Sequence, residues 1–136
     1  KVVNQKQLQN FNVVKTETFG DQRINFIIKN KLQVSSSNNE QHQIFLKLTT
    51  DKKKKIKEKN IKNEITKYEI NIITHVEFKV AGKLKNYKFS VNETGSYNVS
   101  SQYSQTLNNE KQLIKILAEN ILNQILEDLT SKLNDL

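Results

Sequence analysis

A regular alternation of apolar and polar residues marks residues 66–80 as the clearest element of this sequence. One set of alternate positions begins with Tyr68, Ile70 and Ile72 and continues to Val80, while the positions between them are mostly charged or polar. Because successive side chains of a strand point to opposite faces, the pattern predicts a long strand with one buried face and one face in water.

A return strand is predicted directly after it, over residues 85–103. Ala81-Gly82-Lys83 is typical of a tight turn between the two strands, and Gly95 suggests a bulge within the second. The inward positions of this second strand are predicted to be Tyr87, Phe89, Val91, Tyr97, Val99 and Tyr103.

The remaining pattern predicts a strand over 8–17, a helix over 21–34 capped by Asp21, and a strand over 42–50. A long helix is expected over 108–133, with Asn108 as its N-cap. Its continuous apolar stripe consists of Ile114, Leu117, Ala118, Ile121, Leu122, Ile125, Leu129 and Leu133. The order β-α-β-β-β-α in one domain over residues 1–136 predicts an α+β fold. We expect a two-layer sandwich in which both helices cover one face of a four-stranded, mostly antiparallel sheet.

Composition narrows the possible functions. The 136 residues include no cysteine, which excludes disulfides, thiol catalysis and cysteine-ligated zinc, and no apolar run approaches the length of a membrane span. The net charge of +8 is concentrated, since residues 52–67 carry +6 and residues 79–88 carry +4. The chain begins at Lys1 rather than methionine, so we expect that an upstream segment was removed or is not included in this sequence.

The sequence contains no recognisable catalytic or metal-binding motif. His42 and His75 are far apart and lack partners at ligand spacing, and we expect His75 to be a surface residue. The carboxylates are scattered over polar faces, so we predict a non-enzymatic protein with no cofactor and no metal.

The lysine-rich segment at residues 51–64 is expected to be a loop between two strands. It could be a solvated connection, a nucleic-acid-binding segment or a contact for another polyanion. Nucleic-acid binding would rest on these lysines alone, because the open face of the sheet is expected to carry no aromatic residue. Strand directions place the predicted helix start near Asn108 beside this loop, and lysines next to a helix N-terminus suit phosphate. Lys83 and Lys85 are expected at the opposite end of the sheet.

Three stretches resemble the lipopolysaccharide-assembly lipoprotein LptE of Gram-negative outer membranes, and the resemblance covers about residues 10–133. They are FNVVKTETFGDQRINFIIKNKL, YEINIITHVEFKVAGK and YNVSSQYSQTLNNEKQLIKILAENILNQILEDL. The resemblance implies two helices on a four-stranded sheet and no catalytic activity. It also implies a signal peptide and a lipidated cysteine upstream of this chain, which would anchor the protein to the periplasmic side of the outer membrane.

The resemblance further implies two partners, the outer-membrane β-barrel LptD, in which the domain would sit as a plug, and lipopolysaccharide, and it implies no nucleic acid. The implied lipopolysaccharide contacts are the loop before the long strand and the residues just before the last helix. Carried onto this chain, they are Lys52, Lys53, Lys54, Lys55, Lys57, Lys59, Asn108 and Lys111. A basic residue expected before the last helix is replaced by Leu107, and Lys111 is the nearest cation. The alternatives are a nucleic-acid-binding module that uses the same lysines and a periplasmic adaptor without lipid contact.

Overall fold

The predicted fold is confirmed. A computed structural model describes residues 11–35 and 42–135. It has the order β1 (Asn12–Gly20), α1 (Gln22–Ser35), β2 (Gln43–Lys59), β3 (Ile65–Val80), β4 (Asn86–Asn98) and α2 (Tyr103–Asn134). The sheet order is β1-β2-β3-β4; β1 and β2 are parallel, and the other neighbours are antiparallel. Residues 8–10 of the first predicted strand lie outside the described residues.

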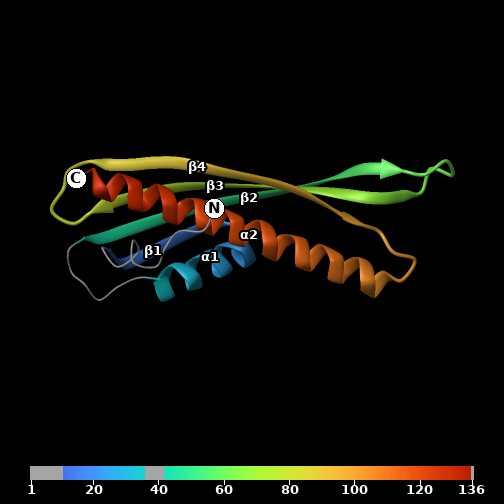
Figure 1. Ribbon diagram of the computed structural model, residues 1–136, viewed down its shortest axis with the longest axis horizontal. Coiled ribbons are helices and arrows are strands. Elements are labelled where there is room, and N and C mark those ends of the chain that lie inside the picture. The colour runs from blue at the N-terminus through green and yellow to red at the C-terminus, as the bar shows by residue number, and fades with distance from the viewer. Residues whose placement is uncertain (1–10, 36–41, 136) are drawn as a thin grey trace.

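The molecule is elongated, and the hairpin of β2 and β3 forms its longest feature (Figure 1). The hairpin extends beyond α1 and past the start of α2, so its tip projects from one end of the molecule. The β3–β4 turn and the C-terminal end of α2 lie at the opposite end.

The helix-facing side of the sheet is the core, as the alternation predicted. Ile70, Ile72, Val76, Phe78 and Val80 of β3 are buried. All eight residues of the predicted apolar stripe of α2 are buried too, together with Leu126 and Thr130. Removing these side chains from water is the main stabilising term of the fold.

The junction between β1 and α1 is held by a buried polar network. Gly20 has a φ of +87°, and a Cβ at this position would lie 2.0 Å from the carbonyl oxygen of Thr50, so only glycine fits. Asp21 caps α1 as predicted, because its Oδ1 accepts a hydrogen bond from the N–H of Ile24 at 3.0 Å. The Thr50 hydroxyl donates to Asn25 Oδ1 at 2.6 Å, and it also lies 2.9 Å from the Thr74 hydroxyl.

Three boundary predictions are wrong. β2 continues to Lys59, nine residues past its predicted end, so the lysine-rich segment is a strand rather than a loop. β4 ends at Asn98 and α2 begins at Tyr103, so Asn108 lies inside α2 and does not cap it. Tyr103 is 77% exposed and does not belong to the core.

The predicted bulge at Gly95 is also wrong. The β3–β4 register is regular through Gly95, which pairs with Ile70. A Cβ on Gly95 would lie 2.7 Å from Leu113 Cδ1, so glycine here lets α2 pack closely against β4. The register irregularities lie elsewhere, between Val13 and Lys15 in β1 and between Ile56 and Lys59 in β2.

Two adjacent isoleucines test the assignment of the two faces. Ile72 is fully buried, whereas Ile73 lies on the opposite face and is only partly buried. We expect Ile72→Asn to lower the free energy of unfolding by roughly 3 kcal/mol or more, and Ile73→Asn to lower it by about 1 kcal/mol. Urea denaturation followed by circular dichroism measures both, and equal losses would contradict the assignment.

Candidate functional site

The candidate site is the lysine hairpin, which we define as residues 51–67. Its first half is a regular strand, since Lys52 pairs with Ile72, Lys54 pairs with Ile70 and Ile56 pairs with Tyr68 across the antiparallel ladder. The turn occupies residues 60–64, and β3 begins at Ile65. Because strand residues alternate between two faces, this pairing divides the predicted lipopolysaccharide-binding lysines into two sets.

Lys52 and Lys54 lie on the helix-facing side. Lys54 Nζ lies 3.2 Å from Glu110 Oε2 in α2 and 4.4 Å from the centre of the Tyr68 ring. The Tyr97 hydroxyl donates to the same Glu110 oxygen at 3.1 Å, which closes a cluster between β2, β4 and α2. Lys52 makes a looser ion pair with Asp21, with Nζ 3.9 Å from Oδ2.

The electrostatics of this cluster follow from its contacts. The interaction with the Tyr97 side chain, followed by that with Glu110, raises the pKa of Lys54 above its ordinary value, although partial burial opposes this change. Burial raises the pKa of the Tyr97 hydroxyl. Lys54 is therefore a charged, internally paired residue that ties the hairpin to α2.

The outward lysines make cross-strand ion pairs. Lys55 Nζ lies 3.1 Å and Lys57 Nζ lies 3.6 Å from the carboxylate of Glu69, and Lys67 lies 3.1 Å from Glu58. The hydrogen bond from Lys55 is the largest cause that holds the pKa of Glu69 below its ordinary value, and the charge of Lys57 adds to the effect.

Within the described part of the chain, Lys53 and Lys59 have no carboxylate within ion-pair distance, and the same holds for Lys62 in the turn. Lys53 also lines an open hollow of about 550 Å³, together with Lys55, Glu69 and others. The three lysines without a carboxylate partner can meet an external anion without first losing an internal contact.

The second predicted lipopolysaccharide contact, near the start of α2, lies only partly beside the lysine hairpin. A hollow of about 310 Å³ lies between the hairpin and the start of α2, and Lys54, Leu107 and Glu110 are among the residues that line it. Asn108 and Lys111 are exposed on α2 and do not line this hollow. Glu110, rather than Lys111, is the charged residue of α2 that meets the lysines.

Sequence reasoning missed Tyr68, Tyr97 and Glu110 as parts of this site. Both tyrosines were assigned to the inward face correctly, and their rings stack at 5.7 Å between centroids. The signal that could have found them is that both tyrosines lie on the same face of the sheet as Lys54. That signal appears only once β2 is extended through the lysines.

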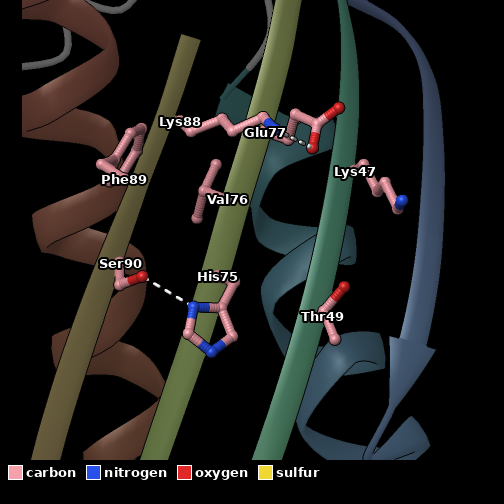
Figure 2. A pocket seen from close by; sticks show the side chains of 8 residues that line it. All are labelled: Lys47, Thr49, His75, Val76, Glu77, Lys88, Phe89 and Ser90. Atoms are coloured by element: carbon pink, nitrogen blue, oxygen red, sulfur yellow. Dashed lines mark hydrogen bonds and ion pairs between the residues drawn. The ribbon is translucent and has the colours of Figure 1, made fainter.

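The outer face of the sheet carries a further hollow, of about 360 Å³, lined by His75, Ser90, Glu77 and Lys88 among others (Figure 2). The imidazole Nδ1 of His75 lies 2.7 Å from the Ser90 hydroxyl. Glu77 meets Lys88 and Asn86, and the Asn86 hydrogen bond is the largest cause of its lowered pKa. Among the described residues no carboxylate orients the imidazole, so this pair lacks the third member of a hydrolytic triad. The prediction that His75 is a surface residue is confirmed.

The expectation that the outer face carries no aromatic residue is wrong. Phe45 follows the inward Ile44 and therefore points outward, where it is 43% exposed. Phe19 lies at the end of β1 with the amine of Lys47 5.2 Å from its ring centre. The outer face is therefore largely polar, and these two phenylalanines stand at different positions along the β1–β2 pair.

No helix in the described ranges is long and apolar enough to span a membrane. Among the same residues, no group of three or more histidine or carboxylate side chains is placed to hold a metal ion.

No protein-family model and no curated protein matches the sequence. Solved structures do match it. The rare lipoprotein B from Shewanella oneidensis has a TM-score of 0.67 at 11% identity, over 89% of this chain and 97% of that chain. A putative lipoprotein from Caulobacter crescentus CB15 has a TM-score of 0.62 at 13% identity, over 96% and 95%. Lipoprotein B from Nitrosomonas europaea has a TM-score of 0.57 at 9% identity, over 93% and 88%.

These matches establish the fold of the chain. Rare lipoprotein B belongs to the LptE family, so the resemblance to LptE is confirmed at the level of the fold. The three similar proteins are lipoproteins by description.

The pKa of Glu69 provides a test of the outward ion pairs. We expect Lys55→Gln to raise this pKa toward its ordinary value, because the contact that lowers it most is lost. Since the folded-state pKa is lowered, the contribution of this contact to stability is present above the ordinary value and is lost as the pH falls through the folded-state value. NMR titration of the Glu69 side chain measures the change. The control is Lys53→Gln, which removes a neighbouring charge without a carboxylate contact, and an equal shift in both variants would contradict the specific pairing.

Proposed function

We propose that this domain is a non-enzymatic component of lipopolysaccharide assembly at the outer membrane, which acts as the plug of an LptD-type β-barrel and binds lipopolysaccharide through the lysine hairpin. The observation that carries the proposal is an ordered, lysine-rich hairpin at one end of a fold shared with rare lipoprotein B. In this proposal the full-length protein is lipid-anchored on the periplasmic side.

The chemistry of the hairpin supports a phosphate-bearing ligand. The residues from 52 to 67 carry a net charge of +6, and the strand pairing holds them in fixed positions. Lysines in such an array attract the phosphates of lipid A as point charges rather than by shape recognition. Of the three lysines without a carboxylate partner in the described part of the chain, Lys53 and Lys59 are the proposed primary contacts. Lys54 and Lys52 fix the hairpin against the rest of the domain. Lys55 and Lys57 also contribute to the proposed attraction of phosphate, although both are paired with Glu69. Asn108 and Lys111 remain proposed as a weaker, secondary contact.

The outer face of the sheet supports a plug that lies in a polar lumen. Its side chains bond one another across the strands, for example Asn71 to Asn92 at 2.7 Å and to Thr94 at 2.6 Å. A face with such satisfied polar groups can lie against a hydrated wall without exposing a large apolar surface.

Two double variants test the lysine hairpin. Lys53→Gln/Lys59→Gln should weaken lipopolysaccharide binding about 10- to 30-fold, because each charge near an anionic lipid surface contributes roughly 1 kcal/mol. The matched control is Lys83→Gln/Lys85→Gln, which removes the same charge at the far turn and should have little effect. Binding is measured by sedimentation with lipopolysaccharide at two salt concentrations, and added salt should weaken it. Equal losses in both variants would show diffuse attraction instead of a site.

The barrel partnership has its own test. When the full-length protein is co-expressed with its LptD-type barrel, the two should co-purify as a detergent-stable complex. The barrel should also fail to assemble when this protein is depleted, as judged by its heat-modifiable mobility. A barrel that assembles normally without this protein would refute the partnership.

Nucleic-acid binding is the second candidate, and the two phenylalanines of the outer face favour it. Phe19 lies beside Lys47, and Phe45 lies beside Lys15, so each supplies a ring on which a single-stranded base could stack next to a basic group. Single-stranded DNA is therefore titrated beside lipopolysaccharide. Tight DNA binding that is lost in Phe45→Ala, without lipopolysaccharide binding, would favour this candidate over the first.

A further inference from the structure

An isoleucine stands at the tip of the lysine hairpin with its side chain in water. Ile61 is 103% exposed, so no other part of the described chain covers it. Single exposed apolar residues are common on protein surfaces and need no explanation by themselves. The surroundings of Ile61 set it apart, because it is held by an ordered turn and flanked by cations without a carboxylate partner in the described chain.

The turn that carries Ile61 is built by Asn60. The Oδ1 of Asn60 accepts hydrogen bonds from the N–H groups of Lys62 at 2.9 Å and Glu64 at 3.0 Å, and its Nδ2 donates to Glu64 Oε1 at 3.0 Å. Backbone bonds close the turn from both sides, from the Asn60 N–H to the Glu64 carbonyl at 2.9 Å and from the Asn63 N–H to the Asn60 carbonyl at 3.0 Å. Asn63 takes a φ of 65°, which asparagine tolerates better than most residues. The turn therefore directs Ile61 away from the body of the hairpin.

The charges nearest Ile61 are two lysines and two glutamates. Both glutamates are already engaged, Glu58 with a lysine of β3 and Glu64 with the asparagine that builds the turn. The two lysines are therefore the charges left to meet the phosphates of a lipid layer. Lys59 and Lys62 lie within two residues of it, and neither has a carboxylate partner among the residues that the structure describes. Long lysine side chains can keep their amines at the level of lipid phosphates while a neighbouring aliphatic side chain enters the acyl region. The apolar side chain then leaves water, and the amines keep polar neighbours.

The opposite end of the molecule provides a comparison within the same chain. Leu84 is also 103% exposed and lies between Lys83 and Lys85 in the β3–β4 turn. There, however, the amine of Lys85 is drawn back over the ring of Tyr87 at 4.9 Å, and the cluster carries the smaller charge.

We propose that Ile61 is a lipid-insertion residue, which enters the acyl layer of an anionic lipid surface while Lys59 and Lys62 remain at its phosphates. The inference rests on the proposed function for the orientation of the hairpin toward lipid. It adds to that function an apolar contact which charge attraction alone does not provide.

Tryptophan substitution tests the insertion directly, because the chain contains no tryptophan. Ile61→Trp places a single fluorophore at the tip, and Leu84→Trp places one at the matched position of the far turn. Each variant is mixed with vesicles of phosphatidylglycerol and phosphatidylcholine whose acyl chains carry bromine, with vesicles of phosphatidylcholine alone, and with lipopolysaccharide. On the anionic vesicles, the emission of the Ile61→Trp variant should shift to shorter wavelength and be quenched by the brominated chains. The Leu84→Trp variant should keep the emission of a residue in water.

A second pair of variants measures the contribution to affinity. Ile61→Ser keeps every charge and should weaken binding to the anionic vesicles about 3- to 10-fold, as expected for partial burial of one aliphatic side chain. Leu84→Ser should leave the affinity unchanged. Both positions are fully exposed, so neither change removes a packing contact.

The outcomes separate this inference from the function on which it rests. If the protein binds lipopolysaccharide and the anionic vesicles while the Ile61→Trp variant stays unquenched, or if the Leu84→Trp variant is quenched equally, insertion of Ile61 is refuted and the lysine site stands. If the Ile61→Trp variant is quenched on the anionic vesicles but lipopolysaccharide does not bind, the proposed function is refuted and insertion stands. If neither lipid binds, both are refuted.

Discussion

The antiparallel pairing of β2 with β3 is the interaction on which the rest of the structure depends. It runs from Ile44 opposite Val80 to Lys59 opposite Ile65 and joins the core to the tip, with register irregularities only between Ile56 and Lys59. The apolar half of β2 fixes the register, because a slip by one residue would turn Ile44, Leu46 and Leu48 out of the core. The lysines from Lys52 to Lys55 inherit that register, which gives their side chains defined directions although all of them are exposed.

This pairing changes the meaning of the charge that the sequence displays. Lysines in a solvated loop would carry their charges at no fixed positions, whereas the strand places alternate lysines on two opposite faces of the sheet. Four of the six lysines from 52 to 59 have a carboxylate nearby, supplied by Asp21, Glu69 and Glu110. Exposed pairs of this kind contribute little to stability, but they hold long side chains in chosen rotamers. Fewer lysine charges are therefore unpaired within the described hairpin than the composition suggests.

The parts of the fold that could be predicted are those with long apolar periodicity. The alternation of β3 and the stripe of α2 each extend over many residues, so one residue that departs from the pattern does not change the assignment of the element. The lysine half of β2 offered no such signal, since lysine is a poor strand former and the inward position of Lys54 shows no contrast in hydropathy with Lys53. The start of α2 is mispredicted for the same reason, because the helix runs from Tyr103 to Leu113 before its buried stripe begins at Ile114. Pairing with β3 makes the lysine half of β2 a strand, and the start of α2 is hard to predict because it lacks an apolar pattern.

The division between the two lysine faces also sets how a ligand can bind without disturbing the domain. A phosphate at Lys54 would compete with Glu110 and with the cation–π contact to Tyr68, and it would leave Glu110 beside the Tyr97 hydroxyl without its cation. The helix-facing lysines are therefore less available to an external anion, and they connect the hairpin to the rest of the domain. Lys53, Lys59 and Lys62 face no such competition from the residues that the structure describes. In the proposed function, an anion would therefore meet these three lysines, and the contacts that join the hairpin to α2 would remain intact while it binds.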